Sequence, residues 1–206
     1  LIMTDYKAIH GKNIQHLASD LDNAEGEGQI WFNTTTSDYK TITKVAGSWS
    51  TGDDLNTGRR GPGSIGIQTA ALAVGGEADP GEAVVVEKYN GTSWTEVGDI
   101  NTARRNLSGA GTATAGLAYG GAYTAKDETE EYDGSSWTEV GDLNTARGVM
   151  ATCSGGTSTA TITAGGADPS ATDAVELWNG ASWTETTEIN TARMGAGGAG
   201  TQTAQI

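Results

Sequence analysis

The sequence predicts an all-β protein built from repeated units of about 45 residues. Three segments carry nearly the same eighteen letters: residues 87–104 (EKYNGTSWTEVGDINTAR), 130–147 (EEYDGSSWTEVGDLNTAR) and 176–193 (ELWNGASWTETTEINTAR). A shorter copy, GSWSTGDDLNTGR, covers residues 47–59. One tryptophan and one arginine recur in every copy, both at spacings of 45, 43 and 46 residues: Trp49, Trp94, Trp137 and Trp183, and Arg59, Arg104, Arg147 and Arg193. A fixed period of this length is typical of an array of one supersecondary unit.

Each full copy contains a predicted β-hairpin. The pairs Asn90-Gly91, Asp133-Gly134 and Asn179-Gly180 accept positive φ at both central positions of a type I′ turn. Valine, threonine and aromatic residues flank these pairs, as expected of strands. We therefore expect a two-residue turn at each pair, between antiparallel strands.

Two further strands are predicted upstream of each hairpin. Short apolar runs that end in a double glycine cover residues 70–76 (AALAVGG), 115–121 (AGLAYGG) and 160–166 (ATITAGG). Such a run is too short for a helix and fits a strand buried on both faces. The stretch before it, for example residues 105–112 (RNLSGAGT), is poor in large side chains, as a closely packed inner strand would be. Each period then holds four strands, which is one propeller blade.

These marks, in this order, resemble the kelch repeat. The marks are Gly75-Gly76, Tyr89 and Trp94 in the first unit, Gly120-Gly121, Tyr132 and Trp137 in the second, and Gly165-Gly166, Trp178 and Trp183 in the third. The third unit departs from the others by placing Trp178 where they have tyrosine. The resemblance implies a kelch-like β-propeller of four-stranded antiparallel blades over residues 29–206, with full units at about 59–104, 104–147 and 147–193 and partial units at both ends.

The ends of the repeat region leave two possibilities open. The segment after Arg193, MGAGGAGTQTAQI, copies the start of a unit and stops before the double glycine. Either the two partial units close a fourth blade together, or the propeller is incomplete in this chain. We favour an incomplete propeller, because kelch-like rings usually need more than four blades.

Residues 1–28 are expected to form a separate N-terminal docking segment. The spacing of Ile14, Leu17 and Leu21 predicts one face of a short helix, and residues 23–28 (NAEGEG) form a polar break. The following hairpin, residues 29–45, either belongs to the first blade or continues the docking region.

The motif GQIWFN at residues 28–33 resembles N-terminal hairpins of tail and fibre proteins of marine bacteriophages. That resemblance implies a virion structural protein that is associated with the tail or a fibre. Its expected partners are other virion proteins, met through the N-terminal segment, and a host surface receptor, with several copies in each particle. The alternative is a cellular kelch-type scaffold that binds other proteins.

Composition excludes several function classes. The net charge of −14 disfavours nucleic acids and anionic membranes as partners. No apolar run is long enough for a membrane-spanning helix. Cys153 is the only cysteine, and His10 and His16 lie outside the repeats, so neither a catalytic triad nor a cysteine-based metal site is expected. We therefore expect no enzyme activity and no cofactor.

The connection after each double glycine differs between the units, and variable loops on a repeated scaffold often carry function. We expect receptor contacts there, from Glu77, Asp79, Glu82, Tyr123, Lys126, Asp127, Asp168 and Asp173. The alternatives are a solvated acidic rim and a calcium site, although no calcium-binding motif is present.

The arginine is the only basic residue that recurs in every unit. Glu87, Glu130 and Glu176 lie two residues before the third-strand aromatic and share its face, where a carboxylate needs a partner. We predict bidentate pairs between the repeated arginines and glutamates, within one blade or across to the next, that set the blade register. The alternative is a channel lined by arginines that bind anions.

Overall fold

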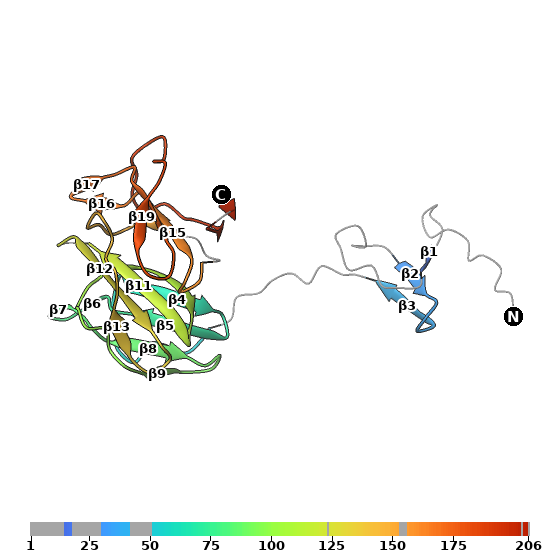
Figure 1. The fold of residues 1–206 in the computed structure, drawn as a ribbon. Coiled ribbons are helices and arrows are strands. Elements are labelled where there is room, and N and C mark those ends of the chain that lie inside the picture. Colours follow the sequence, from blue (N-terminus) through green and yellow to red (C-terminus); the bar gives the residue numbers. More distant parts are fainter. Residues whose placement is uncertain are drawn as a thin grey trace, which may run out of the picture. The chain divides into compact units, whose positions relative to one another are not determined.

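The computed structural model describes residues 15–17, 30–41, 51–122, 124–152, 156–202 and 204–205 (Figure 1). The chain divides into two compact units, Leu1–Thr51 and Gly52–Ile206. The described residues form strands, turns and irregular segments without any helix, so the all-β prediction is confirmed. No described helix is long and apolar enough to cross a membrane.

The first unit contains a three-stranded sheet. Strand β1 (Gln15–Leu17) pairs in parallel with β2 (Ile30–Asn33), which pairs antiparallel with β3 (Asp38–Thr41). The predicted helix is therefore wrong at residues 15–17, and the other positions of its face, Ile14 and Leu21, lie outside the described residues. The hairpin β2–β3 falls in the same compact unit as β1.

The second unit contains three four-stranded antiparallel sheets, each made by one repeat in simple chain order. Sheet 1 consists of β4 (Gly63–Ile67), β5 (Ala70–Val74), β8 (Val86–Tyr89) and β9 (Trp94–Glu96). Sheet 2 consists of β10 (Ser108–Thr112), β11 (Ala115–Gly121), β12 (Lys126–Tyr132) and β13 (Trp137–Glu139). Sheet 3 consists of β14 (Ala151–Thr152), β15 (Thr161–Ala164), β18 (Val175–Trp178) and β19 (Trp183–Glu185). The prediction of four strands per repeat is confirmed.

Three short hairpins complete the second unit. They are β6 (Glu77–Ala78) with β7 (Gly81–Glu82), β16 (Ala167–Asp168) with β17 (Ser170–Ala171), and β20 (Gly200–Thr201) with β21 (Ala204–Gln205). The first two hairpins are insertions between the second and third strands of sheets 1 and 3, and they lie on the left of Figure 1.

The turn between the third and fourth strands differs in detail from the prediction. In sheet 1, Tyr89 pairs with Trp94, and the N–H of Asn90 donates to the carbonyl of Ser93, so the two central residues are Gly91 and Thr92. Only Gly91 has a positive φ, of 94°, so the type I′ assignment is wrong. The Asn90 side chain accepts hydrogen bonds from the N–H groups of Thr92 and Ser93 and caps the turn. Asp133 and Asn179 cap the equivalent turns.

The first strands of the three sheets lie against one another, with β10 in contact with both β4 and β14. Small residues permit this approach: a Cβ atom built on Gly109 of β10 would lie 2.5 Å from Cγ1 of Ile65 in β4. The small-residue inner strand expected from the sequence is therefore present. The sheets do not form a closed ring within the described residues.

Two apolar cores fill the spaces between successive sheets. Trp137 of sheet 2 packs with Val74, Val86 and Ile100 of the first repeat. Trp183 of sheet 3 packs with residues of the second repeat in the same way, and its ring lies 4.7 Å from that of Tyr119. Both tryptophans are buried, because the preceding sheet covers them.

Trp94 of sheet 1 is only half-buried, because no sheet of the described residues precedes it. Trp49 lies outside the described residues.

Candidate functional site

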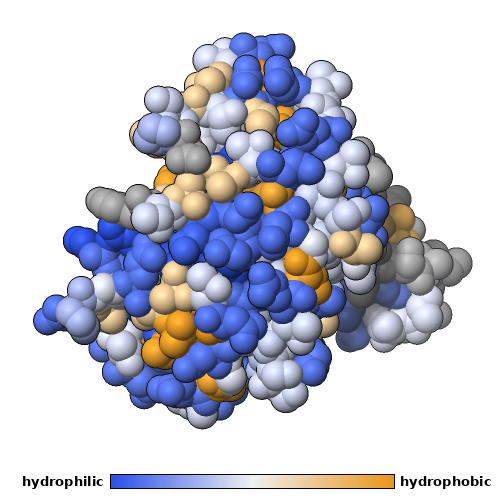
Figure 2. Space-filling view, turned by 60° about the vertical axis from the view of Figure 1, so that its left-hand side comes forward, coloured by the Kyte–Doolittle hydropathy of each residue, from blue (hydrophilic) through white to orange (hydrophobic). Residues whose placement is uncertain are grey.

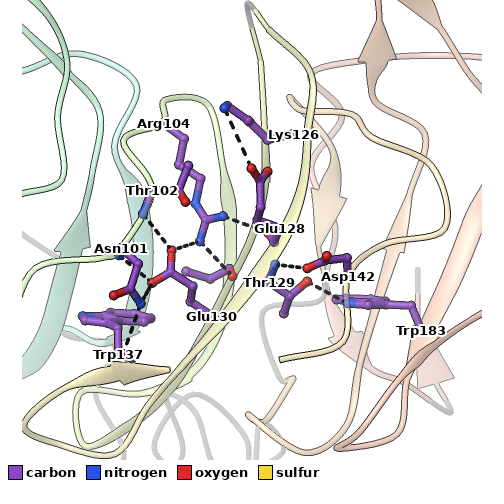
Figure 3. Close-up of polar contacts among 11 residues, drawn as sticks. Asn101, Thr102, Arg104, Lys126, Glu128, Thr129, Glu130, Trp137, Asp142 and Trp183 are labelled. Atoms are coloured by element: carbon purple, nitrogen blue, oxygen red, sulfur yellow. Dashed lines mark hydrogen bonds and ion pairs between the residues drawn. The ribbon is translucent and has the colours of Figure 1, made fainter. Parts of the chain in front are cut away.

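The most elaborate polar site joins sheet 1 to sheet 2, and it is centred on the buried carboxylate of Glu130 (Figure 3). One oxygen, Oε2, accepts hydrogen bonds from the backbone N–H and the side-chain amide of Asn101, at 2.7 and 2.8 Å. The other, Oε1, accepts from the N–H of Thr102 at 3.3 Å and from Nη2 of Arg104 at 2.9 Å. Four donors from the end of one repeat therefore surround a single carboxylate of the next repeat.

The same arrangement of residues occurs three times along the chain, and we call these three sites the joints. The loop that ends one repeat supplies an asparagine and an arginine, and the third strand of the next sheet supplies the glutamate: Asn56, Arg59 and Glu87; Asn101, Arg104 and Glu130; Asn144, Arg147 and Glu176. The three glutamates and the three arginine side chains are almost completely buried. The predicted pairing of the repeated arginines with the repeated glutamates is confirmed for these three pairs, and each pair joins successive repeats.

The prediction of bidentate geometry is wrong. In the second joint, Arg104 reaches only one oxygen of Glu130, because the Asn101 donors occupy the other. The guanidinium also donates to the carbonyl of Glu128 at 2.9 Å. Arg147 similarly donates to the carbonyls of Thr145 and Gly165. Through the carbonyls of Glu128 and Gly165, these arginines bind the backbone of the next repeat as well as its carboxylate, whereas Thr145 lies in the arginine's own loop.

The backbone of three of the repeated arginines, Arg104, Arg147 and Arg193, is held by the double glycine of its own repeat. The N–H of Gly76 donates to the carbonyl of Arg104 at 2.9 Å, and Gly121 and Gly166 make the same bond to Arg147 and Arg193. The first glycine of each pair allows this contact, since a Cβ atom on Gly75 would lie 2.6 Å from the carbonyl oxygen of Arg104. The double glycine thus fixes the loop in one sheet, while the arginine side chain enters the next.

Electrostatics at the joint favour the ionised carboxylate. Burial alone would raise the pKa of Glu87, but the N–H groups of Asn56 and Thr57, the Asn56 amide and the charge of Arg59 outweigh it and lower the pKa. Burial lowers the pKa of Arg104, and Glu130 opposes that effect. An arginine remains protonated in such a site, so the joint is an ion pair.

The joint asparagines were not identified from the sequence as functional positions. Each side-chain amide donates both to the joint glutamate and to the carbonyl of the tryptophan in the next sheet, as Asn101 does to Trp137. Their invariant place in the recurring N-T-A-R or N-T-G-R segment was the available signal.

The contact between sheets 2 and 3 contains a buried hydrogen bond that the contact between sheets 1 and 2 lacks. Trp183 donates from Nε1 to the hydroxyl of Thr129 at 3.0 Å. The equivalent position in sheet 1 is Val86, which has no acceptor, and Nε1 of Trp137 is buried without a hydrogen-bond partner. The cost of such an orphaned donor is about 1–3 kcal/mol.

The variable connections contain their own ion pairs. Glu77 accepts from Nε and Nη2 of Arg60, at 2.9 and 2.8 Å, and it also pairs with Arg105. Glu82 lies 3.8 Å from Nε of Arg105. Two of the predicted binding carboxylates are therefore engaged by arginines of successive repeats, which leaves less free negative charge here than the sequence suggested.

The other predicted binding residues lie in the corresponding connections of their repeats. Asp79 and Asp127 are exposed, Asp173 is half-buried, and Lys126 lies 3.9 Å from Glu128. Asp168 belongs to β16, and Tyr123 lies outside the described residues. The seven described residues of this set are distributed over connections that belong to three different sheets.

Among the described residues, no group of three or more histidine, cysteine or acidic residues could hold a metal ion. The face in Figure 2 is largely hydrophilic, with small separate apolar patches. A cavity of about 450 Å³ beside sheet 3 is lined by Ala164, Ile189, Asn190 and Arg193, among others. Arg193 is exposed and has no carboxylate partner among the described residues.

Comparison with known proteins adds no family. No protein-family model matches the chain, and no curated protein is measurably similar to it.

Proposed function

We propose that the three sheets of residues 52–206 are blades of a kelch-like β-propeller, and that the chain is a non-catalytic structural protein of a bacteriophage particle, associated with its tail or a fibre. The observation that carries this proposal is the joint, repeated three times with the same residue types and the same contacts. Its donors and acceptors are used to hold sheet to sheet, which is the chemistry of a rigid scaffold.

The arrangement of the sheets supports the propeller. Each repeat gives one four-stranded antiparallel sheet, and the first strands of successive sheets lie side by side. A radial array places the first strand of every blade nearest the axis, where only small side chains fit. The glycines and alanines of β10 meet that requirement.

The N-terminal unit supports attachment to a larger assembly. It forms a compact unit of its own and carries the hairpin β2–β3 that contains the IWFN motif. In the proposed particle this unit docks onto other virion proteins, and the variable connections of the sheets face the host receptor or brace neighbouring subunits.

The proposal is tested by quantitative mass spectrometry of particles purified from a lysate in which the chain is produced. We expect the chain to co-purify with capsid and portal proteins at a fixed number of copies per particle. A variant lacking residues 1–51 should still fold, because the second unit has its own core, but it should be lost from the particles. Recovery of the full chain only in particle-free fractions would contradict the proposal and favour the cellular scaffold.

A further inference from the structure

The exposed end of sheet 3 has the components of a fourth joint. The loop after β19 contains Asn190 and Arg193, which correspond to Asn101 and Arg104 in the sequence repeat. The carbonyl of Arg193 accepts a hydrogen bond from the N–H of Gly166 at 2.9 Å, the same backbone bond that fixes Arg104 and Arg147. All three repeated glutamates already have an arginine in their own joints, and the Arg193 side chain has no carboxylate among the described residues.

The cavity of about 450 Å³ beside this loop lies where the filled joints hold a tryptophan. Its wall residue Ile189 corresponds to Ile100 and Leu143, which pack in the cores that contain Trp137 and Trp183. Ala164 corresponds to Val74 and Tyr119, which belong to those same two cores. The cavity therefore combines an apolar wall with a guanidinium and an amide, as the filled joints do.

The hairpin β20–β21 supplies the first half of a further sheet. Gly200 pairs with Gln205 and Thr201 with Ala204, which is the register of Gly111 with Gly116 and Thr112 with Ala115 in sheet 2. The hairpin is held on sheet 3 by Gln202, whose amide donates to the carbonyls of Thr161 and Trp178 at 3.2 and 2.9 Å. Among the described residues, no third strand pairs with β21.

We infer that the Asn190–Arg193 loop, its cavity and β21 form a docking site for an isolated β-hairpin of this chain's own repeat type. The incoming hairpin adds its first strand beside β21, as β12 lies beside β11 in sheet 2. Its glutamate accepts hydrogen bonds from Asn190 and Arg193, and its tryptophan fills the cavity. The negative charge of the hairpin complements Arg193, which has no carboxylate partner among the described residues. This inference holds whether or not the sheets belong to a closed propeller.

The probe is a synthetic peptide of residues 126–139 (KDETEEYDGSSWTE), which contains the third and fourth strands of sheet 2. We expect saturable binding to the full chain by isothermal titration calorimetry. The peptide variant Glu130→Gln should bind at least about tenfold more weakly, because it leaves the arginine without its carboxylate. The variant Glu131→Gln loses the same charge from the opposite face of the strand and serves as the matched control.

Protein variants locate the site. Arg193→Gln should weaken binding of the unchanged peptide by a similar factor, whereas Arg60→Gln, at an exposed arginine that does not line the cavity, should not. Circular dichroism establishes that both variants remain folded. Equal binding of the two peptide variants, or no effect of Arg193→Gln, would indicate nonspecific strand addition and would overturn the inference.

Two other outcomes also contradict the inference. One is the absence of peptide binding at millimolar concentration. The other is self-association of the chain, measured by sedimentation velocity, that Arg193→Gln abolishes while peptide binding is absent, since Arg193 would then contact the surface of a folded copy and not a separate hairpin.

Discussion

The substitution Glu130→Gln keeps the shape of the side chain and removes the charge at the centre of the second joint. The carboxylate of Glu130 accepts four hydrogen bonds, three from Asn101 and Thr102 and one from Arg104. A glutamine in its place has one acceptor oxygen and one donor group. Its NH₂ must face either the two Asn101 donors or the Arg104 guanidinium, and both arrangements place donors against donors.

The expected cost follows from what remains buried. Arg104 has no exposed side-chain surface, so Glu130→Gln leaves its charge without a partner inside the protein. Removing one partner of a buried ion pair typically costs about 3–5 kcal/mol of unfolding free energy. Arg104→Met should cost less, about 2–3 kcal/mol, because Glu130 keeps its hydrogen bonds from Asn101 and Thr102, and hydrogen bonds to charged groups contribute about 1.5–3 kcal/mol.

Urea unfolding monitored by tryptophan fluorescence measures both variants, the double variant and the control Glu131→Gln on the same strand. We expect the loss of unfolding free energy to be largest for Glu130→Gln, smaller for Arg104→Met and below about 1 kcal/mol for the control. The double variant should lose less unfolding free energy than the sum of the losses of the two single variants. The reason is that, once one partner of the ion pair has been replaced, replacing the other no longer breaks that pair. A loss below about 1 kcal/mol for Glu130→Gln would refute the conclusion that the joint holds the sheets together.

Three further predictions concern other sites of the second unit. Thr129→Val removes the acceptor of Trp183 and should cost about 1–3 kcal/mol of unfolding free energy. The converse change, Val86→Thr, supplies an acceptor for Nε1 of Trp137. Burying a hydroxyl usually lowers stability, but here the new hydrogen bond should offset that cost and leave the unfolding free energy unchanged or higher. A clear loss of unfolding free energy would contradict this expectation. The N–H groups of Ser136 and Ser135 lower the pKa of Asp133 from its usual 3.8 to about 2. Its stabilising effect is therefore present above about pH 4 and is lost as the pH falls through 2, so Asp133→Asn should flatten the pH dependence of the melting temperature in that range. If the melting temperature of the variant depends on pH as steeply as that of the unchanged protein, the Asp133 carboxylate contributes nothing to the pH dependence.

The repeated sheets could be predicted from the sequence because the same local signals recur in every unit. Double glycines, Asn-Gly or Asp-Gly pairs and a recurring tryptophan each constrain the backbone or the core, and together they define four strands. The glutamate–arginine pairing was also predictable, because the glutamate shares the buried face of its strand and only one basic residue recurs.

The predictions that were wrong concern positions where several hydrogen-bonding partners compete for the same group. The type I′ turn was wrong because the Asn90 side chain caps the turn and displaces the two-residue centre to Gly91 and Thr92. Bidentate pairing was wrong because Asn101 occupies one oxygen of Glu130, a contact over 29 residues that no local pattern reveals. The helix expected around Leu17 was wrong because β1 pairs with β2, and strand pairing overrides a three-residue apolar spacing.

The central claim is that each repeat is locked to the next through its asparagine, arginine and glutamate. Amide hydrogen exchange measured by NMR tests it most directly, because the backbone N–H groups of Asn56, Asn101 and Asn144 each donate to a buried joint glutamate, at 2.7 to 2.8 Å. Asn190 is the internal control, since its loop has no glutamate partner among the described residues. The account predicts slow exchange at the first three asparagines and fast exchange at Asn190. Equal exchange at all four would contradict it.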